Sequence, residues 1–317
     1  MIAFTDLSIY WPEVVRFRER VASRYQPGVG ADCVVVLPCS KHKPYISSRS
    51  HRLFAEAIGP ARRRASVEEL TITSPLGAVP RALETIPPAS NYDIAVTGVW
   101  SHEEVEVVSS SLATVLSKHS PTEVIAHVSG GYLDACRRAE AALGWTFTYT
   151  GTGGPASKEG LEELSKALRG IDGQPRRRDP IELAKHVLSY QYGLNIAELM
   201  TLPPARRDVS ARMERIVRDG KTLARRNPFT GFFTPEIEGA RILADQGAYC
   251  VDIDFRPKVK VIYCPGVISA DPAIRPDDEV VVRWKGQPVG QGRSLLNGRE
   301  MAASDMGKAV VLREIFP

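Results

Sequence analysis

The sequence has few cysteines and no long apolar run, and each absence excludes a class of protein. Its five cysteines are scattered over 317 residues, and no two of them form a Cys-x-x-Cys pair. This spacing supports neither a structural zinc site nor a disulfide framework, so we expect no metal and a reducing, cytoplasmic location. No apolar run approaches the roughly 20 residues of a membrane span, and the first residues lack a signal-peptide layout. We therefore expect a soluble protein without a membrane partner.

The chain also carries little net charge, +4, but the charge is unevenly distributed. Residues 206–226 hold eight basic and three acidic side chains, a surplus larger than that of the whole chain. A second basic cluster, 176–178, lies upstream. Such a run is often only a solvated helix face, and it fits contact with nucleic-acid phosphates equally well. The candidates for RNA contact are Arg206, Arg212, Arg215, Arg225 and Arg226.

Strand-like and helical runs alternate in the first half of the chain. Cys-Val-Val-Val-Leu at 33–37 has the continuous apolar character of a buried parallel strand. The alternation predicts βαβ units and a doubly wound, mostly parallel sheet with helices on both faces. The predicted strands are Cys33–Leu37, Leu70–Thr73, Ile94–Thr97, Val124–Val128 and Trp145–Tyr149, and the predicted helices are 7–26, Glu103–Lys118 and Leu133–Leu143.

The second half changes character twice. Residues 157–247 show helical spacing interrupted by breakers, which predicts a helical connector, either alone or with a small sheet. Residues 248–317 consist of short strand-like runs and turns. We therefore expect three parts: an α/β core over 1–156, the connector over 157–247 and a β-domain over 248–317. The connector helices are predicted at Leu161–Leu168, Ile181–Tyr190 and Asp208–Leu223, and the last strands at Cys250–Phe255, Val259–Cys264, Val280–Trp284, Pro288–Gly292 and Ala309–Phe316.

The densest group of reactive side chains directly follows the first predicted strand. Residues 38–51 contain a thiol, lysines, imidazoles, a phenol and several hydroxyls. Open α/β sheets bind ligands beyond the carboxyl ends of their parallel strands, and functional groups concentrate on loops that a rigid sheet holds. The segment therefore predicts a catalytic or ligand-binding site, and the alternative is a basic surface loop that only touches phosphate.

Within this segment the pattern Pro-Cys-x-x-x-Lys-Pro-Tyr-x-x-Ser-x-Ser-His is similar to the signature of the archaeosine synthase family. Residues 73–84, 92–100 and 127–132 resemble three further segments of that family. Residues 265–311 resemble a PUA domain, a small, partly open β-barrel that binds structured RNA; the alternative is a generic small barrel. Family members usually carry a transglycosylase-like module in front of the region that this chain matches.

The resemblance implies a core similar to the uracil-DNA glycosylase fold and a transferase acting on tRNA. Such an enzyme adds free lysine to the nitrile of 7-cyano-7-deazaguanine in the D-loop of archaeal tRNA, a step of archaeosine biosynthesis. We expect tRNA and lysine as partners and no cofactor. A separate transglycosylase-like subunit and a radical enzyme that completes archaeosine are further expected partners. Two alternatives stay open: a non-catalytic, PUA-containing tRNA-binding subunit of an archaeal tRNA-guanine transglycosylase, and a glycosylase acting on a nucleobase.

Addition to a nitrile suggests roles for three residues. Cys39 is flanked by basic side chains that favour a thiolate, and it is either the nucleophile of a thioimidate or a small packing residue. Lys43, which Pro44 biases toward an extended backbone, would place positive charge against the nitrile nitrogen or a phosphate. His51 is the expected proton shuttle near neutral pH.

The substrate-binding candidates come from the same motif segments. Hydroxyls after the first strand either cap the next helix or bind anionic groups, and a phenol either stacks on a base or packs. Glycines permit close approach of backbone to a ring or open a helix at an anion site. Arg81 and Glu84 either anchor the carboxylate and the ammonium of an amino-acid substrate or form an ordinary ion pair. The candidates are Tyr45, Ser48, Ser50, Ser74, Gly77, Arg81, Gly130 and Gly131.

Overall fold

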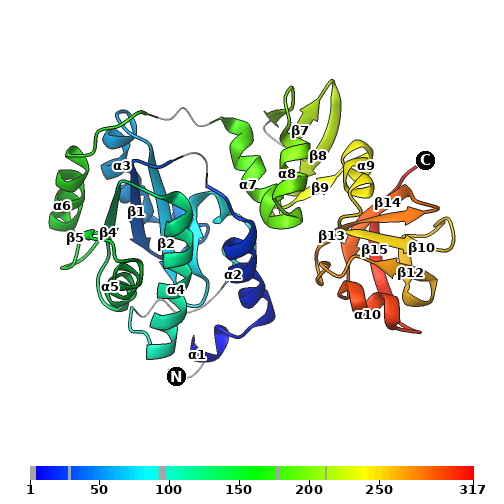
Figure 1. The fold of residues 1–317 in the computed structure, drawn as a ribbon, viewed down its shortest axis with the longest axis horizontal. Helices are drawn as coiled ribbons and strands as arrows, with labels where there is room; N and C mark the ends of the chain where they lie inside the picture. The colour runs from blue at the N-terminus through cyan, green and yellow to red at the C-terminus, as the bar shows by residue number, and fades with distance from the viewer. Residues whose placement is uncertain (1–4, 28–29, 93–97, 176–178, 211–212) are drawn as a thin grey trace. The chain divides into compact units, whose positions relative to one another are not determined.

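The structure is a computed structural model that describes residues 5–27, 30–92, 98–175, 179–210 and 213–317. The chain separates into two compact units, residues 1–178 and 179–317 (Figure 1). The helix α6 (Lys158–Arg169), which we assigned to the connector, packs against the first unit's core. The three-part division expected from the sequence stays a prediction beside these two units.

The first unit contains a five-stranded sheet in the order β3-β2-β1-β4-β5. Four strands run parallel, and β3 pairs antiparallel with β2 at one edge. The mixed α/β core with a mostly parallel sheet is therefore confirmed, whereas β3 was not predicted and the predicted strand at 94–97 lies outside the described residues. The bounds are β1 (Cys33–Pro38), β2 (Val67–Thr73), β3 (Gly77–Pro80), β4 (Glu123–His127) and β5 (Phe147–Thr150).

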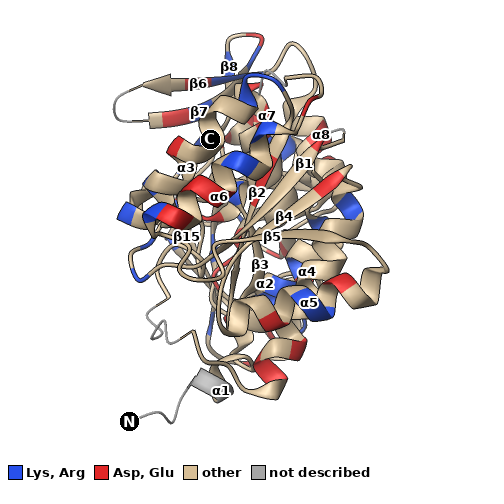
Figure 2. Ribbon diagram, turned by 90° about the vertical axis from the view of Figure 1, so that its left-hand side faces the viewer, with Lys and Arg blue, Asp and Glu red and all other residues tan. Residues whose placement is uncertain are grey.

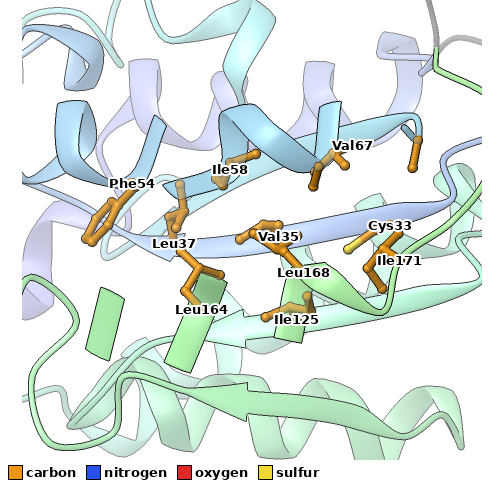
Figure 3. Close-up of a cluster of buried hydrophobic side chains, with 12 residues drawn as sticks. Cys33, Val35, Leu37, Phe54, Ile58, Val67, Ile125, Leu164, Leu168 and Ile171 are labelled. Carbon is orange, nitrogen blue, oxygen red and sulfur yellow. The ribbon is translucent and has the colours of Figure 1, made fainter. Parts of the chain in front are cut away.

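Helices cover both faces of this sheet (Figure 1). Alternate residues of β1, such as Val35 and Leu37, pack against α3 and α6, as Figure 3 shows. The residues between them are equally buried on the other face, so β1 is apolar on both sides, as expected of a central parallel strand. The remaining elements are α1 (Thr5–Ser8), α2 (Pro12–Arg24), η1 (Tyr45–Ser47), α3 (Arg49–Arg62), η2 (Arg81–Leu83), α4 (His102–His119) and α5 (Gly131–Leu143).

The second unit begins with two helices and a four-stranded antiparallel sheet. The helix predicted over Asp208–Leu223 is wrong, because this segment forms hairpin strands. Asp219 and Gly220 both have positive φ, 50° and 77°, and Asp-Gly is a favoured pair for the turn of a two-residue hairpin. The bounds are α7 (Pro180–Tyr192), α8 (Leu194–Thr201), β6 (Arg206–Ser210), β7 (Met213–Arg218), β8 (Lys221–Arg226), β9 (Phe233–Pro235) and α9 (Ile237–Asp245).

The chain ends in a curled six-stranded sheet in the order β11-β15-β14-β13-β10-β12. The five strands predicted here are confirmed within a few residues, whereas β12 and α10 were not predicted. None of the described helices is long and apolar enough to cross a membrane. The bounds are β10 (Cys250–Ile253), β11 (Val261–Tyr263), η3 (Cys264–Gly266), β12 (Val267–Ala270), β13 (Glu279–Trp284), β14 (Gln287–Ser294), α10 (Gly298–Ala303) and β15 (Lys308–Ile315).

Candidate active site at the carboxyl edge of the sheet

The half-buried thiol of Cys39 lies where β1 ends, within reach of the helix that follows β4. Its sulfur is 3.1 Å from the hydroxyl of Tyr132, in the first turn of α5. Because β1 and β4 are parallel neighbours, their carboxyl ends bring these two side chains to one edge of the sheet. The sequence predicted a site at this edge, and the structure places a thiol and a phenol together there.

Two further tyrosines extend this group. The hydroxyl of Tyr45 is 2.9 Å from that of Tyr92, which is 2.8 Å from Oγ1 of Thr73 at the end of β2. The ammonium of Lys43 lies 3.9 Å from the centroid of the Tyr92 ring, a distance typical of a cation–π contact. We call Cys39, Lys43, Tyr45, Tyr92 and Tyr132 the Cys39 cluster.

The three phenols of the cluster are neutral at ordinary pH. Burial raises the pKa of Tyr45, Tyr92 and Tyr132, and negative charge on Cys39 would raise each pKa further. Neutral phenols can donate hydrogen bonds to a charged group, and Lys43 adds a positive charge beside them. The Cys39 cluster therefore combines a thiol with neutral phenol donors and a cation.

His51 lies under this cluster and is completely buried. Its Nε2 is 3.0 Å from the carbonyl oxygen of Pro38, and its Nδ1 is 3.2 Å from Nη2 of Arg81. Nε2 must carry the proton that it donates to the carbonyl, and Nδ1 accepts from the guanidinium. Burial, and then the charge of Arg81, lower the pKa of His51 to about 4, so the ring is neutral near pH 7. These contacts favour a residue that positions the end of β1, and the expected proton shuttle stays a prediction.

Arg81 is engaged by two buried carboxylates. Its Nε donates to Glu69 at 2.8 Å and its Nη1 to Glu84 at 2.7 Å. Glu84 also accepts the backbone N–H of Ile46 at 3.3 Å, which ties η1 to this network. The ordinary ion pair with Glu84, one of the two alternatives from the sequence, is thus present in the structure.

Ser48 takes the helix-capping role that the sequence left open. Its hydroxyl accepts the backbone N–H of His51 at the start of α3 and lies 3.3 Å from that of Ser50. Ser74, after β2, donates to the buried carboxylate of Glu104 at 2.5 Å. The other oxygen of Glu104 accepts the N–H of Ser101 at 2.8 Å, so one carboxylate joins the two loops that flank the site.

The glycines predicted as substrate contacts lie at this edge, where close packing of the protein itself requires a residue without a side chain. Gly77 has φ +77°, and a Cβ there would stand 2.3 Å from Oγ of Ser111 in α4. Gly130 has φ +58°, and its Cβ would lie 2.9 Å from the carbonyl oxygen of Gly98. That oxygen already accepts the N–H of Gly131 at 2.9 Å. Within the described residues, these glycines fit protein backbone and side chains closely, and an anion site at Gly130 and Gly131 stays a prediction.

The predicted RNA-binding arginines lie on strands of the second unit. Arg215 and Arg225 are cross-strand neighbours that are about half exposed, 46% and 48%, and pair with Asp208 and Glu236. Arg206 is exposed on β6. Figure 2 shows acidic residues interspersed with basic ones on these strands. Arg226 is different: it is 14% exposed and pairs with Glu214, which is 13% exposed. Arg212 and residues 176–178 lie outside the described residues.

Sequence reasoning assigned no role to several residues of the site. Tyr92, Tyr132 and Thr73 lie in the motif segments that carry the family resemblance, and this position could have identified them as candidates for the site. Glu69 and Glu104 had no such signal, because only the tertiary fold shows that they are buried beside cations or loops.

Comparisons with known proteins agree with this organisation. Residues 14–168 match the family model described as Domain of unknown function (DUF5591), and residues 254–316 match the PUA domain. The crystal structure of AF0587, a protein of unknown function, superposes with a TM-score of 0.74 at 29% identity, covering 95% of this chain and 100% of that one. The tRNA-guanine(15) transglycosylase of Pyrococcus abyssi is 32% identical over 44% of this chain and 26% of its own length.

The archaeosine synthase subunit alpha of Methanosarcina acetivorans is 37% identical over 99% of this chain and 51% of its own length. Curated relatives with that name, or named archaeosine synthase, are 30 to 37% identical to the chain over nearly its whole length. The chain spans about half the length of these relatives. From these similarities and the two matched domains, the chain belongs to the archaeosine synthase family.

Proposed function

We propose that the chain carries out the lysine addition of archaeosine biosynthesis: it joins free lysine to the nitrile of 7-cyano-7-deazaguanine in the D-loop of tRNA. The observation that carries this proposal is the Cys39 cluster, which puts a thiol, phenol donors and a lysine cation at the carboxyl edge of the sheet. The family membership supplies the substrate class, and the PUA domain fits a structured RNA.

The chemistry of a nitrile assigns a part to each member of the cluster. The thiolate of Cys39 adds to the nitrile carbon, and the nitrile nitrogen takes a proton from a donor such as the Tyr132 hydroxyl, giving a thioimidate. The lysine amine then attacks the same carbon, its surplus proton returns to the donor, and the C–S bond breaks to release the Cys39 thiolate. The net change is addition of one N–H across the C≡N bond, with nothing released.

The charges near the cluster serve this sequence of steps. Lys43 stabilises the negative charge that develops on the nitrile nitrogen. His51 and Arg81 hold the backbone that carries Cys39, so we propose them as positioning residues. Ser50 and Ser74 remain proposed contacts of the base or of lysine. Tyr45 is completely buried and stacks on the His51 ring with 5.4 Å between centroids, so we propose the packing role for it instead. Arg206, Arg215 and Arg225 are proposed phosphate contacts, in addition to the PUA domain.

We further propose a uracil-DNA glycosylase-like topology for the core, supported by its mostly parallel sheet with helices on both faces. On the basis of the family membership we also propose a cytoplasmic location, a transglycosylase-like partner and a radical enzyme that completes archaeosine. A tRNA-binding subunit of a transglycosylase is the second candidate function, because part of the chain resembles tRNA-guanine(15) transglycosylase.

The test uses tRNA that already carries the nitrile base, together with labelled lysine. The chain should transfer label to the tRNA, with or without a separately supplied transglycosylase-like region. A Cys39→Ala, Lys43→Ala variant should bind the tRNA and transfer at least 100-fold less label, a loss on the order of that for other catalytic groups. Undiminished transfer by this variant within the assembled complex would favour the tRNA-binding subunit instead.

A further inference from the structure

Exposed large apolar side chains of the first unit gather at one end of it. Among its described residues, five such side chains are exposed: Leu7, Tyr10, Trp11, Ile46 and Val99. Ile46 follows β1, and Val99 precedes the N-cap of α4. Both therefore lie at the carboxyl edge that holds the Cys39 cluster, whereas Leu7 lies in α1.

Tyr10 and Trp11 belong to the same edge. The Tyr10 hydroxyl donates to Glu103 in the first turn of α4, and Figure 1 shows α1 near this end of α4. Arg18 of α2 fixes the arrangement, because it donates to the carbonyl of Pro75 at 2.7 Å and to that of Ile9 at 2.6 Å. One guanidinium thus joins the segment before Tyr10 to the turn that follows β2.

The backbone of Trp11 is fixed as well. Its N–H donates to Ser8, and its carbonyl accepts the N–H groups of Val14 and Val15, both at 2.9 Å, at the start of α2. The indole is nevertheless 44% exposed, and the Tyr10 side chain is 59% exposed. Two consecutive aromatic residues are thus exposed beside the site, in a chain with only 7% aromatic residues, and water solvates such rings poorly.

Charge indicates what this surface binds. The segment 38–55 contains no acidic residue, and Lys41, His42, Arg49 and Arg52 are exposed on it. A polymer that carries both negative charges and flat apolar rings could contact the cations and the aromatic side chains at this edge. Unpaired nucleotides have that composition, and their bases stack on aromatic side chains.

We propose that Tyr10 and Trp11 form a stacking platform for an unpaired base beside the reacting nucleotide, with phosphates facing the cations of 41–52. This inference rests on the proposed function, since it takes tRNA as the substrate. The platform holds a neighbour of the modified base and takes no part in the chemistry. It explains why Arg18 connects the start of α2 to the site.

The test uses the full chain and a D-arm stem-loop RNA with 2-aminopurine placed in its loop. The wild type should change the 2-aminopurine fluorescence on binding, as stacking does. Trp11→Ala and Tyr10→Ala should each weaken binding about fivefold or more, and Trp11→Phe should stay within about twofold, because the ring remains. Trp145→Ala, changed just before β5 at the opposite edge, is the matched control and should bind as the wild type.

The proposal would be overturned if both alanine variants bound the RNA with wild-type affinity and gave the same change in 2-aminopurine fluorescence as the wild type. So would variants that bind the RNA normally but no longer bind a transglycosylase-like chain, because the surface would then be a protein interface. Chemical unfolding identifies variants that fail to fold, and Trp11→Phe provides the comparison in that case. Failure of the proposed function looks different: the wild type would bind the RNA and form no lysine adduct.

Discussion

Arg81 is either part of a structural ion network or an anchor for the substrate, and replacing it by methionine distinguishes the two roles. Its side chain is 12% exposed, and its partners Glu69 and Glu84 are 2% and 5% exposed. Removing one partner of a buried ion pair typically costs about 3–5 kcal/mol of the free energy of unfolding. Because Glu69 keeps Arg62 as a partner, we expect the lower end of that range, about 3 kcal/mol.

The loss should depend on pH in a defined direction. Burial already raises the pKa of Glu84, although Arg81 opposes it, so without Arg81 the pKa rises further. At pH 7 the variant must bury an uncompensated carboxylate, whereas at pH 5 the carboxyl group can take a proton. The Arg81→Met variant should therefore lose less stability at pH 5 than at pH 7.

Urea unfolding followed by tryptophan fluorescence measures this loss, because three of the four tryptophans (11, 100 and 145) belong to the first unit. Arg63→Met, an exposed change at the end of α3, is the control and should stay within about 0.5 kcal/mol of the wild type. If Arg81→Met instead unfolds like the wild type while its KM for lysine rises about tenfold, Arg81 anchors the substrate and the structural role is wrong.

Three further predictions follow from the site and the basic strands. The pKa of His51 is about 4 in the folded chain and 6.5 in the unfolded one, so the free energy of unfolding should fall by about 3 kcal/mol as the pH drops from 6.5 to 4. Urea unfolding of His51→Gln at the same pH values should not show this loss. Cys39 is the half-buried cysteine among four buried ones, so iodoacetamide should alkylate it first in the native chain; mass spectrometry showing another cysteine reacting first would contradict this. Arg215→Ala with Arg225→Ala should weaken tRNA binding about tenfold and flatten its salt dependence, whereas Arg226→Ala should act mainly on stability; equal salt slopes in all variants would reject the assignment.

The features that were best predicted from the sequence are those that a short stretch of chain determines. The apolar run of β1 and the reactive segment after it needed no knowledge of distant residues. The hairpin of β7 and β8 was not predicted, although Asp219-Gly220 is a favoured residue pair for its turn. An alternating apolar pattern would have favoured strands, but ion pairs between arginines and acids replace much of it here.

The parts of the site that escaped prediction depend on contacts between distant segments. Cys39 meets Tyr132, which lies 93 residues further along the chain. His51 was predicted to move protons, but the fold buries it and gives both ring nitrogens a partner, one of them from Arg81. Residue type and spacing carry no information about burial of this kind. The sequence therefore indicated where these side chains gather, whereas which of them react and which only position the backbone stays a prediction.

Addition of intact lysine to a nitrile on tRNA can be detected by mass analysis of the nucleosides. After incubation with the chain and lysine, nitrile-bearing tRNA would be digested to nucleosides. We predict a modified nucleoside heavier than its precursor by the mass of one whole lysine, with no loss of water or ammonia, and none of this nucleoside when Cys39→Ala replaces the wild type. If the wild type leaves the nitrile nucleoside unchanged, even when a transglycosylase-like region is supplied, the chain does not catalyse this addition.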